Sequence, residues 1–598
     1  MFGKKFAFGV NYWASDKATA MWRDFDAVTV EKDLIALRNT GVKWLRIFPI
    51  WKDFQPITLN AAKEEVVYQD GTSLDCTLEG KAGVSPIMMN RLRKVMDLSY
   101  KYGFKIDLAI FSNIAQNTDH IPSLLENKNI FTHPTALIWE QKYIKYLVNC
   151  FCEHPALGGW NVGNVPSVAK KINGDIDAQE SWTMMVCNAI RTIDKEHPII
   201  SGQANLSTYG NWDGWQIIPH AESVDILTTH PYSVSRYKND RINTMSSIIH
   251  STAENGMYED IGGKLCFIEE AGFIKSNLIS SYLYGCHGYF HFSAFDTENN
   301  NYGLLNACRG EKSVSKEAKR IMTVISQIDL PKYQRQAVCV IPLNVKNATE
   351  IAANVMCLAT QNDFGVQYRL ATQELPDSQL YIVPSIEGNS ALRRSTVERL
   401  CQKAREGATV YISVSGGFLS MFHELLGVDI ISREAPVKSL TVNIDGEELP
   451  VTPHYVYHTN NIDGKVLASF SDGTPAIVSH KFGNGKIIIS LFSVESIVSS
   501  LKGDFDREGA AAYYKVYSLI AKAAGVKPAF YTENIYVGAM EHKIDTKRSI
   551  VSLMNYSDTL QNYTVGATVG YQVKKVLYGE LNGKLNKNDA VIFEIEKY

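Results

Sequence analysis

The sequence predicts an α/β protein built around a (β/α)₈ TIM barrel, followed by a second α/β domain and a small C-terminal β-sandwich. Three observations lead to this prediction. Short β-branched or aromatic runs alternate with amphipathic helical stretches from residue 6 to about residue 328. A second, shorter alternation follows a linker at Pro331 to Gln336. From Pro528 onward the chain holds short alternating strands with turn residues between them.

The first 330 residues have the element order of a closed parallel barrel. Eight strands, each followed by a helix, close naturally into a cylinder, and loop insertions account for a length above the usual ~250 residues. The clearest insertion lies between Gln55 and Val84. The strands are expected at Phe8–Tyr12, Lys43–Phe48, Lys105–Phe111, Gly158–Val162, Ile199–Ser201, Asp225–Thr229, Leu265–Glu270 and Gly288–Ser293. Helices are expected at Thr29–Asn39, Pro86–Lys101, Thr135–Cys152, Ala178–Asp194, Asn243–Asn255, Asn277–Tyr284 and Lys316–Ile328.

Two further domains complete the chain, and we expect the three domains to span residues 1–330, 335–525 and 526–598. The second domain is expected to be a doubly wound α/β fold, flavodoxin-like or amidotransferase-like, in which no catalytic cysteine follows a strand. Its strands are expected at Ala337–Ile341, Leu380–Val383, Thr409–Val414 and Gly485–Leu491, and its helices at Glu350–Thr360, Ser390–Glu406 and Glu508–Ala523. The C-terminal strands are expected at Ile535–Ala539, Ser549–Met554, Gln572–Tyr578 and Ala590–Ile595.

Composition and charge argue against several functional classes. Lys and Arg number 60 against 63 Asp and Glu, a net charge of −3, so no strong basic surface is available for nucleic acid. The apolar runs are far shorter than the roughly 18 residues of a membrane span. The ten cysteines lack C-x-x-C spacing and no signal-peptide pattern opens the chain. We therefore expect a cytoplasmic protein with no nucleic acid or membrane partner and no cofactor.

The ends of the barrel strands are polar and aromatic. Barrel enzymes carry their catalytic groups at the C-terminal ends of the strands, so these residues are the candidates for a site. They are Asn11-Tyr-Trp13, Arg46, Phe111-Ser-Asn113, Asn164-Val-Pro166, His230-Pro-Tyr232, Glu269-Glu270 and Phe290-His-Phe292.

Several of these motifs, in this order, resemble the retaining glycoside hydrolases of clan A, which share a (β/α)₈ barrel. The resemblance covers the first 330 residues, and the order of the three domains is similar to that of three-domain β-galactosidases and β-mannosidases. The motifs are Gly9-Val-Asn-Tyr-Trp13, Trp44-Leu-Arg-Ile-Phe48, Gly159-Trp-Asn-Val-Gly-Asn-Val-Pro166, His230-Pro-Tyr232 and Phe267-Ile-Glu-Glu-Ala-Gly272.

The resemblance implies roles for individual residues. A glutamate that ends strand seven is the nucleophile in the clan, and its Glu-x-Gly pattern selects Glu270 here. Arg46 and Tyr232 would then lie beside this carboxylate and keep it ionised. Asn164 would hydrogen-bond the sugar 2-hydroxyl. Adjacent strand residues point to opposite faces, so we expect Glu269 to be a structural carboxylate behind the strand.

Val165 departs from the family pattern. Where the clan has Asn-Glu-Pro, with the glutamate as acid/base, this chain has Asn164-Val165-Pro166. Valine can neither donate a proton nor activate water. Three interpretations stay open: an acid/base variant that still binds sugar, an enzyme that recruits another acid such as Asp296 or Glu298, and a non-catalytic sugar-binding descendant. As solvated loop carboxylates, these two acids can equally have no role.

The remaining candidates fit either a site or the core. Trp13, Trp51, Phe290 and Phe292 can form a platform for a pyranose ring, or pack as plain core. His230 can support the nucleophile, and Asn113 is a candidate for substrate binding by its position after strand three. His287 and His291 have a metal-like spacing without a third ligand, so we expect no metal site.

The sequence thus predicts an O-glycosyl hydrolase on β-linked galactosides, mannosides or similar sugars. Glu270 would be its nucleophile, and Val165 would leave activity reduced or absent. The alternatives are a non-catalytic carbohydrate-binding pseudoenzyme and a transglycosidase. By analogy with the three-domain relatives we expect a homo-oligomer, a trimer or dimer.

Overall fold

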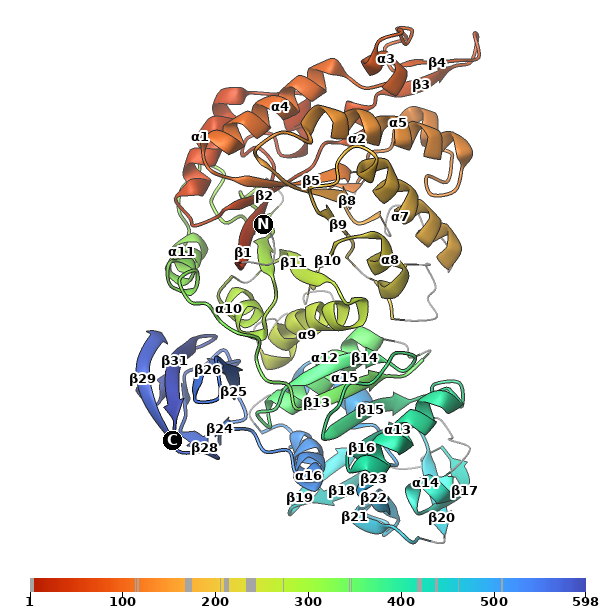
Figure 1. Ribbon diagram of the computed structural model, residues 1–598, viewed down its shortest axis with the longest axis vertical. Coiled ribbons are helices and arrows are strands. Elements are labelled where there is room, and N and C mark those ends of the chain that lie inside the picture. The colour runs from red at the N-terminus through yellow and green to blue at the C-terminus, as the bar shows by residue number, and fades with distance from the viewer. Residues whose placement is uncertain are drawn as a thin grey trace.

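The computed structural model contains a barrel at one end and two sheet-based parts at the other (Figure 1). It describes residues 5–598 except 113, 116–117, 167–174, 205, 209–214, 233–243, 273, 299, 344, 346, 417–421, 436–438, 461 and 507–508.

The barrel is a closed cylinder of parallel strands in the order β1-β12-β11-β10-β9-β8-β5-β2. The eight predicted strands are confirmed, because each run of β-branched and aromatic residues forms one barrel strand. Their bounds are β1 Ala7–Tyr12, β2 Trp44–Ile47, β5 Lys105–Phe111, β8 Leu157–Gly163, β9 Ile199–Ile200, β10 Ile226–Thr229, β11 Leu265–Ala271 and β12 Gly288–His291.

Helices cover the outside of the barrel, and three of them differ clearly from the prediction: one is longer, and the short helices Trp51–Phe54 and Ile217–Ser223 were not predicted. The helix expected to end at Asn255 continues to Gly262, because the chain adopts the left-handed conformation that stops a helix only at Gly263, with φ +64°. The helix between β9 and β10 was not predicted, since it spans only Ile217–Ser223 and contains Pro219. The barrel helices are α1 Ala27–Arg38, α2 Trp51–Phe54, α4 Pro86–Lys101, α5 Pro134–Phe151, α7 Ile176–Arg191, α8 Ile217–Ser223, α9 Met245–Gly262, α10 Ile274–Tyr284 and α11 Ser313–Ile325.

The insertion after β2 forms a small projection from the barrel, seen at the top of Figure 1. It consists of the hairpin of β3 (Ile57–Asn60) with β4 (Glu65–Tyr68), followed by α3 (Leu78–Ala82). Shorter elements in the other barrel loops are β6 Ile114–Ala115, β7 Thr118–Asp119 and the 3₁₀ turns Thr19–Trp22 and Ser123–Leu125.

A layer of apolar side chains fills the barrel interior on the side where the strands begin. Phe290 lies between Phe267 and Trp44, with ring centroids 5.0 and 6.3 Å away. Gly9 makes room for it, because a Cβ there would lie 2.6 Å from the Phe290 ring. The members of this layer are Ala7, Trp44, Ile200, Ile226, Phe267 and Phe290. The layer closes the cylinder, so polar groups further along the strands face only the other end.

A second sheet has seven strands in the order β14-β13-β15-β16-β23-β22-β21, of which the first five are parallel. The strands are β13 Ala337–Ile341, β14 Val366–Leu370, β15 Leu380–Ile386, β16 Thr409–Val414, β21 Lys465–Ser469, β22 Pro475–Phe482 and β23 Gly485–Ser490. Helices and 3₁₀ turns of this part are α12 Ala348–Thr360, α13 Arg394–Glu406, α14 Phe422–Leu426, α15 Val494–Ser500, Asp504–Asp506 and α16 Tyr514–Ala524. Two hairpin-like pairs add β17 Asp429–Glu434 with β20 Val456–Asn460, and β18 Leu440–Ile444 with β19 Glu447–Val451.

The C-terminal part is an antiparallel four-stranded sheet in the order β25-β26-β31-β29, with its own apolar core. The strands are β25 Val537–Lys543, β26 Arg548–Asn555, β29 Tyr571–Tyr578 and β31 Ala590–Lys597. Two short pairs pack beside it: β24 Phe530–Thr532 with β28 Val565–Ala567, and β27 Gln561–Asn562 with β30 Lys584–Leu585.

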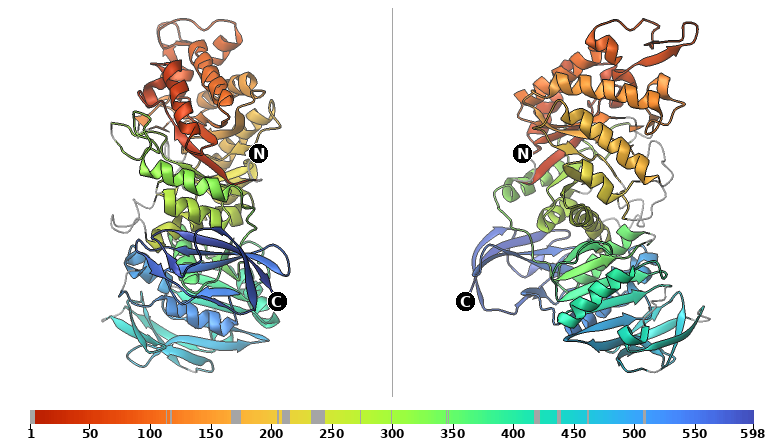
Figure 2. Two further views of the ribbon diagram at one scale, coloured as in Figure 1. Left: turned by 90° about the vertical axis from the view of Figure 1, so that its left-hand side faces the viewer. Right: turned by 45° about the vertical axis from the view of Figure 1, so that its right-hand side comes forward.

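The barrel meets the second sheet through α9, which packs against α12 and β14. The two side views show the C-terminal sheet beside this junction (Figure 2). Within the part of the chain that the structure describes, no helix has the length and apolar character needed to span a membrane.

Candidate active site

A group of buried polar side chains lies beyond the apolar layer, towards the C-terminal ends of the barrel strands. Register places Asn11 of β1 beside Arg46 of β2, and Arg46 beside Asp107 of β5. β8 contributes Asn161, and β11 contributes Glu269 and Glu270. All six residues are less than 10% exposed. Burial of so many polar groups is unfavourable unless they bind one another, and the contacts below show that they do.

Arg46 lies at the centre of this group and bridges the two glutamates. Its Nη1 donates to Glu270 Oε1 at 2.6 Å and to Asn11 Oδ1 at 3.2 Å. Its Nη2 forms an ion pair with Glu269 Oε2 at 2.9 Å. Burial alone would lower the pKa of Arg46, but the neighbouring carboxyl groups outweigh it and raise the pKa. The guanidinium therefore stays charged and can hold two carboxylates.

Glu270 is bound through both carboxylate oxygens and keeps a small exposed surface. Besides Arg46 at Oε1, the Tyr232 hydroxyl donates to Oε2 at 2.8 Å. Burial and the charge of Glu270 raise the pKa of Tyr232 well above its ordinary value, so the hydroxyl keeps its proton. Glu270 is 7% exposed, whereas Glu269 is fully buried. A carboxylate with two fixed donors and an open side has the arrangement that a nucleophile needs.

Glu269 does not lie behind the strand, and our expectation for it is wrong. Between Ile268 and Ala271 the register of β11 against β12 shifts by one residue. Such a bulge breaks the alternation of inward and outward side chains, so two consecutive residues can face the interior. Glu269 accepts from Asn161 Nδ2 at 2.7 Å and from His230 Nε2 at 2.9 Å, both within the barrel.

Asp107 adds a third carboxyl group that the sequence analysis missed. Burial, followed by the charge of Glu269, raises the pKa of Asp107 well above its ordinary value. Burial opposes ionisation of Glu269 as well, yet Arg46 and His230 hold the pKa of Glu269 below its ordinary value. Asp107 therefore keeps its proton while Glu269 is ionised. A charged residue between Ile106 and Leu108 in an otherwise apolar strand was the signal for it.

His230 lies between the two glutamates. Its Nε2 contacts Glu269 Oε2 at 2.9 Å and its Nδ1 lies 3.6 Å from Glu270 Oε2. The structure thus brings together six of the strand-end candidates and adds Asp107 and Asn161. The six are Asn11, Arg46, His230, Tyr232, Glu269 and Glu270.

Val165 and Asn164 follow β8 directly. The Val165 N–H donates to the Gly202 carbonyl at 2.9 Å, and the Asn164 N–H donates to the Phe111 carbonyl at 2.9 Å. These bonds fix both residues among the C-terminal ends of β5, β8 and β9. Val165 has φ +49°, in the left-handed region that β-branched residues rarely adopt. The side chain of Val165 is partly exposed, and that of Asn164 is 8% exposed.

The aromatic candidates divide into two sets. Trp13 stacks on Phe48 at 4.5 Å and meets the edge of Phe292, which also meets Tyr232 at 6.3 Å. This set adjoins the Glu270 carboxylate, because Phe48 also lies under the Arg46 guanidinium at 4.8 Å. By contrast, Phe290 belongs to the apolar layer, and Trp51 is fully buried against Phe111.

Other predicted residues lie apart from this group or outside the described residues. Asp296 is engaged by Lys312 Nζ at 2.7 Å and by the Gly303 N–H at 2.9 Å, and Glu298 is exposed. The His291 Nε2–H donates to the Tyr302 carbonyl at 2.8 Å, while His287 faces Glu259 beyond the other end of β12. Asn113 lies outside the described residues. Among the residues that the structure describes, no three His, Cys, Asp or Glu side chains gather as metal ligands.

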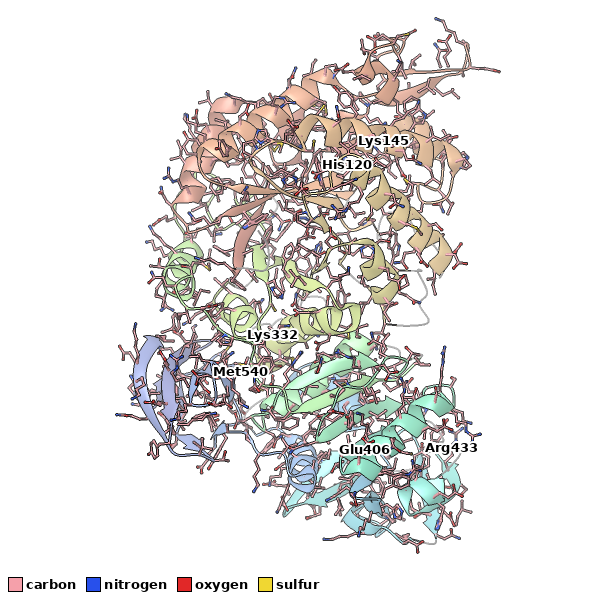
Figure 3. All side chains as sticks on the ribbon, viewed as in Figure 1. His120, Lys145, Lys332, Glu406, Arg433 and Met540 are labelled. Atoms are coloured by element: carbon pink, nitrogen blue, oxygen red, sulfur yellow. The ribbon has the colours of Figure 1, made fainter. Side chains whose placement is uncertain are left out.

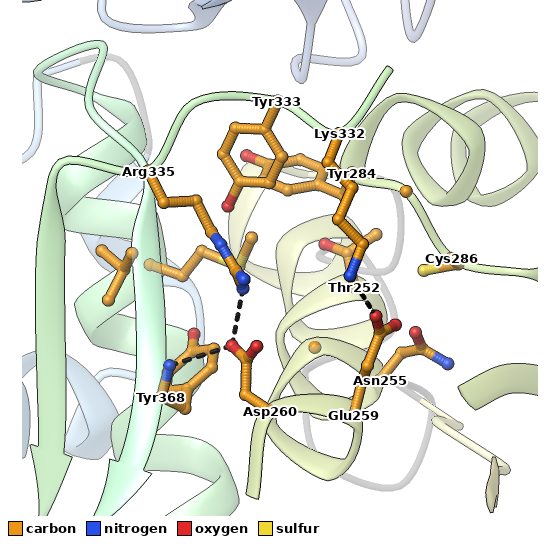
Figure 4. Close-up of a pocket in the computed structure, with 14 residues that line it drawn as sticks. Thr252, Asn255, Glu259, Asp260, Tyr284, Cys286, Lys332, Tyr333, Arg335 and Tyr368 are labelled. Atoms are coloured by element: carbon orange, nitrogen blue, oxygen red, sulfur yellow. Dashed lines mark hydrogen bonds and ion pairs between the residues drawn. The ribbon is translucent and has the colours of Figure 1, made fainter. Parts of the chain in front are cut away.

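A small hollow lies at the junction of the barrel and the second sheet, near Lys332 (Figures 3 and 4). Arg335 pairs there with Asp260 at 2.6 Å, and Asp260 also accepts from the Tyr368 N–H at 3.0 Å. The free volume is about 30 Å³. That is room for about one water molecule and far below the several hundred Å³ of a ligand pocket. This hollow is a packing feature of the junction.

Comparison with known proteins agrees with the architecture. No family model and no curated protein matches the chain. A β-galactosidase from Rahnella sp. R3 superposes with TM-score 0.73 at 12% identity, covering 100% of this chain and 99% of that one. An exo-β-1,4-mannosidase from Opitutaceae bacterium strain TAV5 gives 0.71 at 16% identity, covering 86% and 96%. A β-galactosidase from Bacillus circulans sp. alkalophilus gives 0.70 at 12% identity, covering 99% of both.

The chain has the fold of these glycoside hydrolases. The likeness runs through all three parts of the chain in the two β-galactosidases, since nearly the whole of each molecule is covered.

Proposed function

We propose that this protein binds β-linked glycosides at the C-terminal end of its barrel and forms a covalent glycosyl intermediate on Glu270. The observation that carries the proposal is the hold on this carboxylate by Arg46 at 2.6 Å and Tyr232 at 2.8 Å. Both are donors, so they favour the ionised form that attacks a sugar. The resemblance to retaining hydrolases and the shared fold with β-galactosidases and a β-mannosidase support the substrate class.

The chemistry of the site depends on the leaving group. Glu270 attacks the anomeric carbon and forms a C–O ester bond while the bond to the leaving group breaks, and the leaving group takes the electron pair. With valine at the acid/base position, no proton comes from residue 165. Leaving groups that are stable as anions depart without this help, whereas ordinary alkoxides do not. Hydrolysis of the intermediate is slow for the same reason, since residue 165 cannot activate water.

The test uses 2-fluoro glycosides with a dinitrophenyl leaving group, in the galactose and mannose series. We expect a mass increase located on Glu270, and none in Glu270→Gln. The absence of any adduct across the series would contradict a glycosyl intermediate.

Val165 favours one second candidate, a non-catalytic sugar-binding protein with the same pocket. Val165→Glu separates the two, because the restored carboxylate should raise hydrolysis of aryl glycosides by about 10²- to 10⁴-fold if the rest of the site is competent. Azide should likewise accelerate release of the sugar from the parent protein. Product analysis with an added acceptor sugar tests whether transfer replaces hydrolysis. We also propose that the protein forms a homo-oligomer, a trimer or dimer. Measuring its molecular mass in solution tests this proposal, because a monomer has a mass of 66.8 kDa.

A further inference from the structure

Glu269 occupies a position that the reaction proposed for Glu270 does not explain. It is fully buried, and three side chains from three other strands or strand ends converge on it. Asn161 donates to Oε1 at 2.7 Å, while His230 and Arg46 both lie 2.9 Å from Oε2. An ionised carboxylate buried without solvent is strongly unfavourable unless it binds such partners. Phe267, two residues earlier, faces the barrel interior, so alternation places Glu269 inward as well, and the bulge in β11 lets the next residue, Glu270, face inward too.

Glu269 competes with Glu270 for the guanidinium of Arg46. Asp107 keeps its proton, because burial and the charge of Glu269 raise the pKa of Asp107. Glu269 and Glu270 share one guanidinium, with His230 between them. The Tyr232 hydroxyl donates to Glu270. These are the titratable groups that face Glu269 from β2, β5, β10 and β11.

Because Arg46 contacts both glutamates, only one of its terminal nitrogens binds Glu270. An arginine that gives both terminal nitrogens to one carboxylate binds it in a bidentate fashion and engages both oxygens. Here Nη1 contacts Glu270 and Nη2 contacts Glu269. Among the residues that the structure describes, each oxygen of Glu270 thus has one close donor, Arg46 or Tyr232, and retains a lone pair with which to attack.

We propose that Glu269 is a positioning residue for Glu270: it holds His230 in place and binds one terminal nitrogen of Arg46, so that Glu270 receives only the other. This inference rests on the proposed function, because it assigns Glu269 a role in a reaction at Glu270. Glu269 itself does not touch the sugar.

The first experiment compares Glu269→Gln with the parent and with Glu140→Gln, which removes another fully buried carboxylate of the barrel. The rate of labelling by the 2-fluoro dinitrophenyl glycosides is measured against their concentration. Loss of a contact to a charged group predicts a maximum rate about tenfold or more lower in Glu269→Gln. The half-saturating concentration should change less than about threefold, since Glu269 does not bind sugar. Glu140→Gln should label like the parent.

A second readout is independent of any reaction. In protein labelled with ¹⁵N-histidine, the buried ring N–H of His230 should give a signal that His230→Asn removes. Glu269→Gln should shift this signal, and Glu140→Gln should leave it in place. An unshifted signal overturns the inference. If the parent is not labelled by any glycoside but the signal shifts, the proposed function fails while the hold of Glu269 on His230 is supported.

Labelling of Glu269→Gln at the parent rate also overturns the inference. If this variant does not fold, Glu269→Asp answers the same question, because it keeps the charge but is one methylene shorter. It should slow labelling about threefold or more, and an unchanged rate contradicts the positioning role.

Discussion

Glu269 and Glu270 follow one another in β11, yet both carboxylates point into the barrel, at 2.9 and 2.6 Å from the same guanidinium. In a regular strand one of them would face the surrounding helices. The bulge between Ile268 and Ala271 makes the arrangement possible. The barrel therefore carries two adjacent carboxyl groups around Arg46.

Replacing Arg46 by methionine should destabilise the barrel strongly. The variant leaves two buried carboxylates without their cation, and loss of one partner from a buried pair costs about 3–5 kcal/mol. All nine tryptophans precede residue 216, so tryptophan fluorescence during urea unfolding reports on the barrel. Arg394→Met is the matched control, because its pair with Glu398 is exposed on α13. We expect no measurable change in the control. Equal midpoints for parent and Arg46→Met would show that the network does not support the fold.

Replacing Tyr232 by phenylalanine should slow labelling of Glu270 without unfolding the protein. The hydroxyl donates to Glu270 Oε2 at 2.8 Å, and a hydrogen bond to a charged group contributes about 1.5–3 kcal/mol, which corresponds to roughly 10- to 100-fold in rate. The measurement is the labelling rate with the 2-fluoro glycosides. Tyr100→Phe, on the exposed face of α4, is the control and should label normally. An unchanged rate in Tyr232→Phe argues against a catalytic role for this hydroxyl.

The sequence predicted the barrel well because each strand is a run of β-branched or aromatic residues, and the side chains at the strand ends follow from that placement. It could not predict that both glutamates face the interior, since alternation holds only in a regular strand and nothing in Phe267-Ile-Glu-Glu-Ala marks a bulge. Asp107 could not be predicted for a different reason: it lies inside β5, whereas catalytic groups of barrel enzymes are expected at the C-terminal ends of the strands. Phe290, chosen as a strand end, lies one layer deeper, in the apolar core.

Replacing Val165 by asparagine should stabilise the barrel. Val165 adopts φ +49°, where a β-branched side chain is strained by about 1–2 kcal/mol and asparagine is tolerated. We expect a higher thermal midpoint for Val165→Asn, measured by tryptophan fluorescence. Val165→Ile keeps the branch at Cβ and should show no gain. A midpoint for Val165→Asn that is no higher than that of Val165→Ile would mean that the backbone here carries no strain.

Glu140 makes the stability of the barrel depend on pH. It is fully buried in α5 and receives one hydrogen bond, from Trp182 Nε1 at 3.0 Å. Burial raises its pKa to about 8 in the folded protein. Its pKa in the unfolded chain is near the ordinary value of about 4.3. Between these two values the folded state holds a proton that the unfolded state has released, so the free energy of unfolding falls as pH rises.

Glu140→Gln should remove this dependence, because glutamine keeps the oxygen that accepts from Trp182 and cannot ionise. The variant should gain stability over the parent by about 1.4 kcal/mol for each pH unit between roughly pH 5 and 8, with a constant difference above that range. Thermal midpoints of the two proteins, followed by tryptophan fluorescence from pH 5 to 9, measure the difference. Below about pH 4 the difference should settle at a constant offset, since Glu140 is then protonated in both the folded and the unfolded state. Parallel curves across the whole range would mean that Glu140 ionises normally in the folded barrel, and that its burial does not suppress the charge.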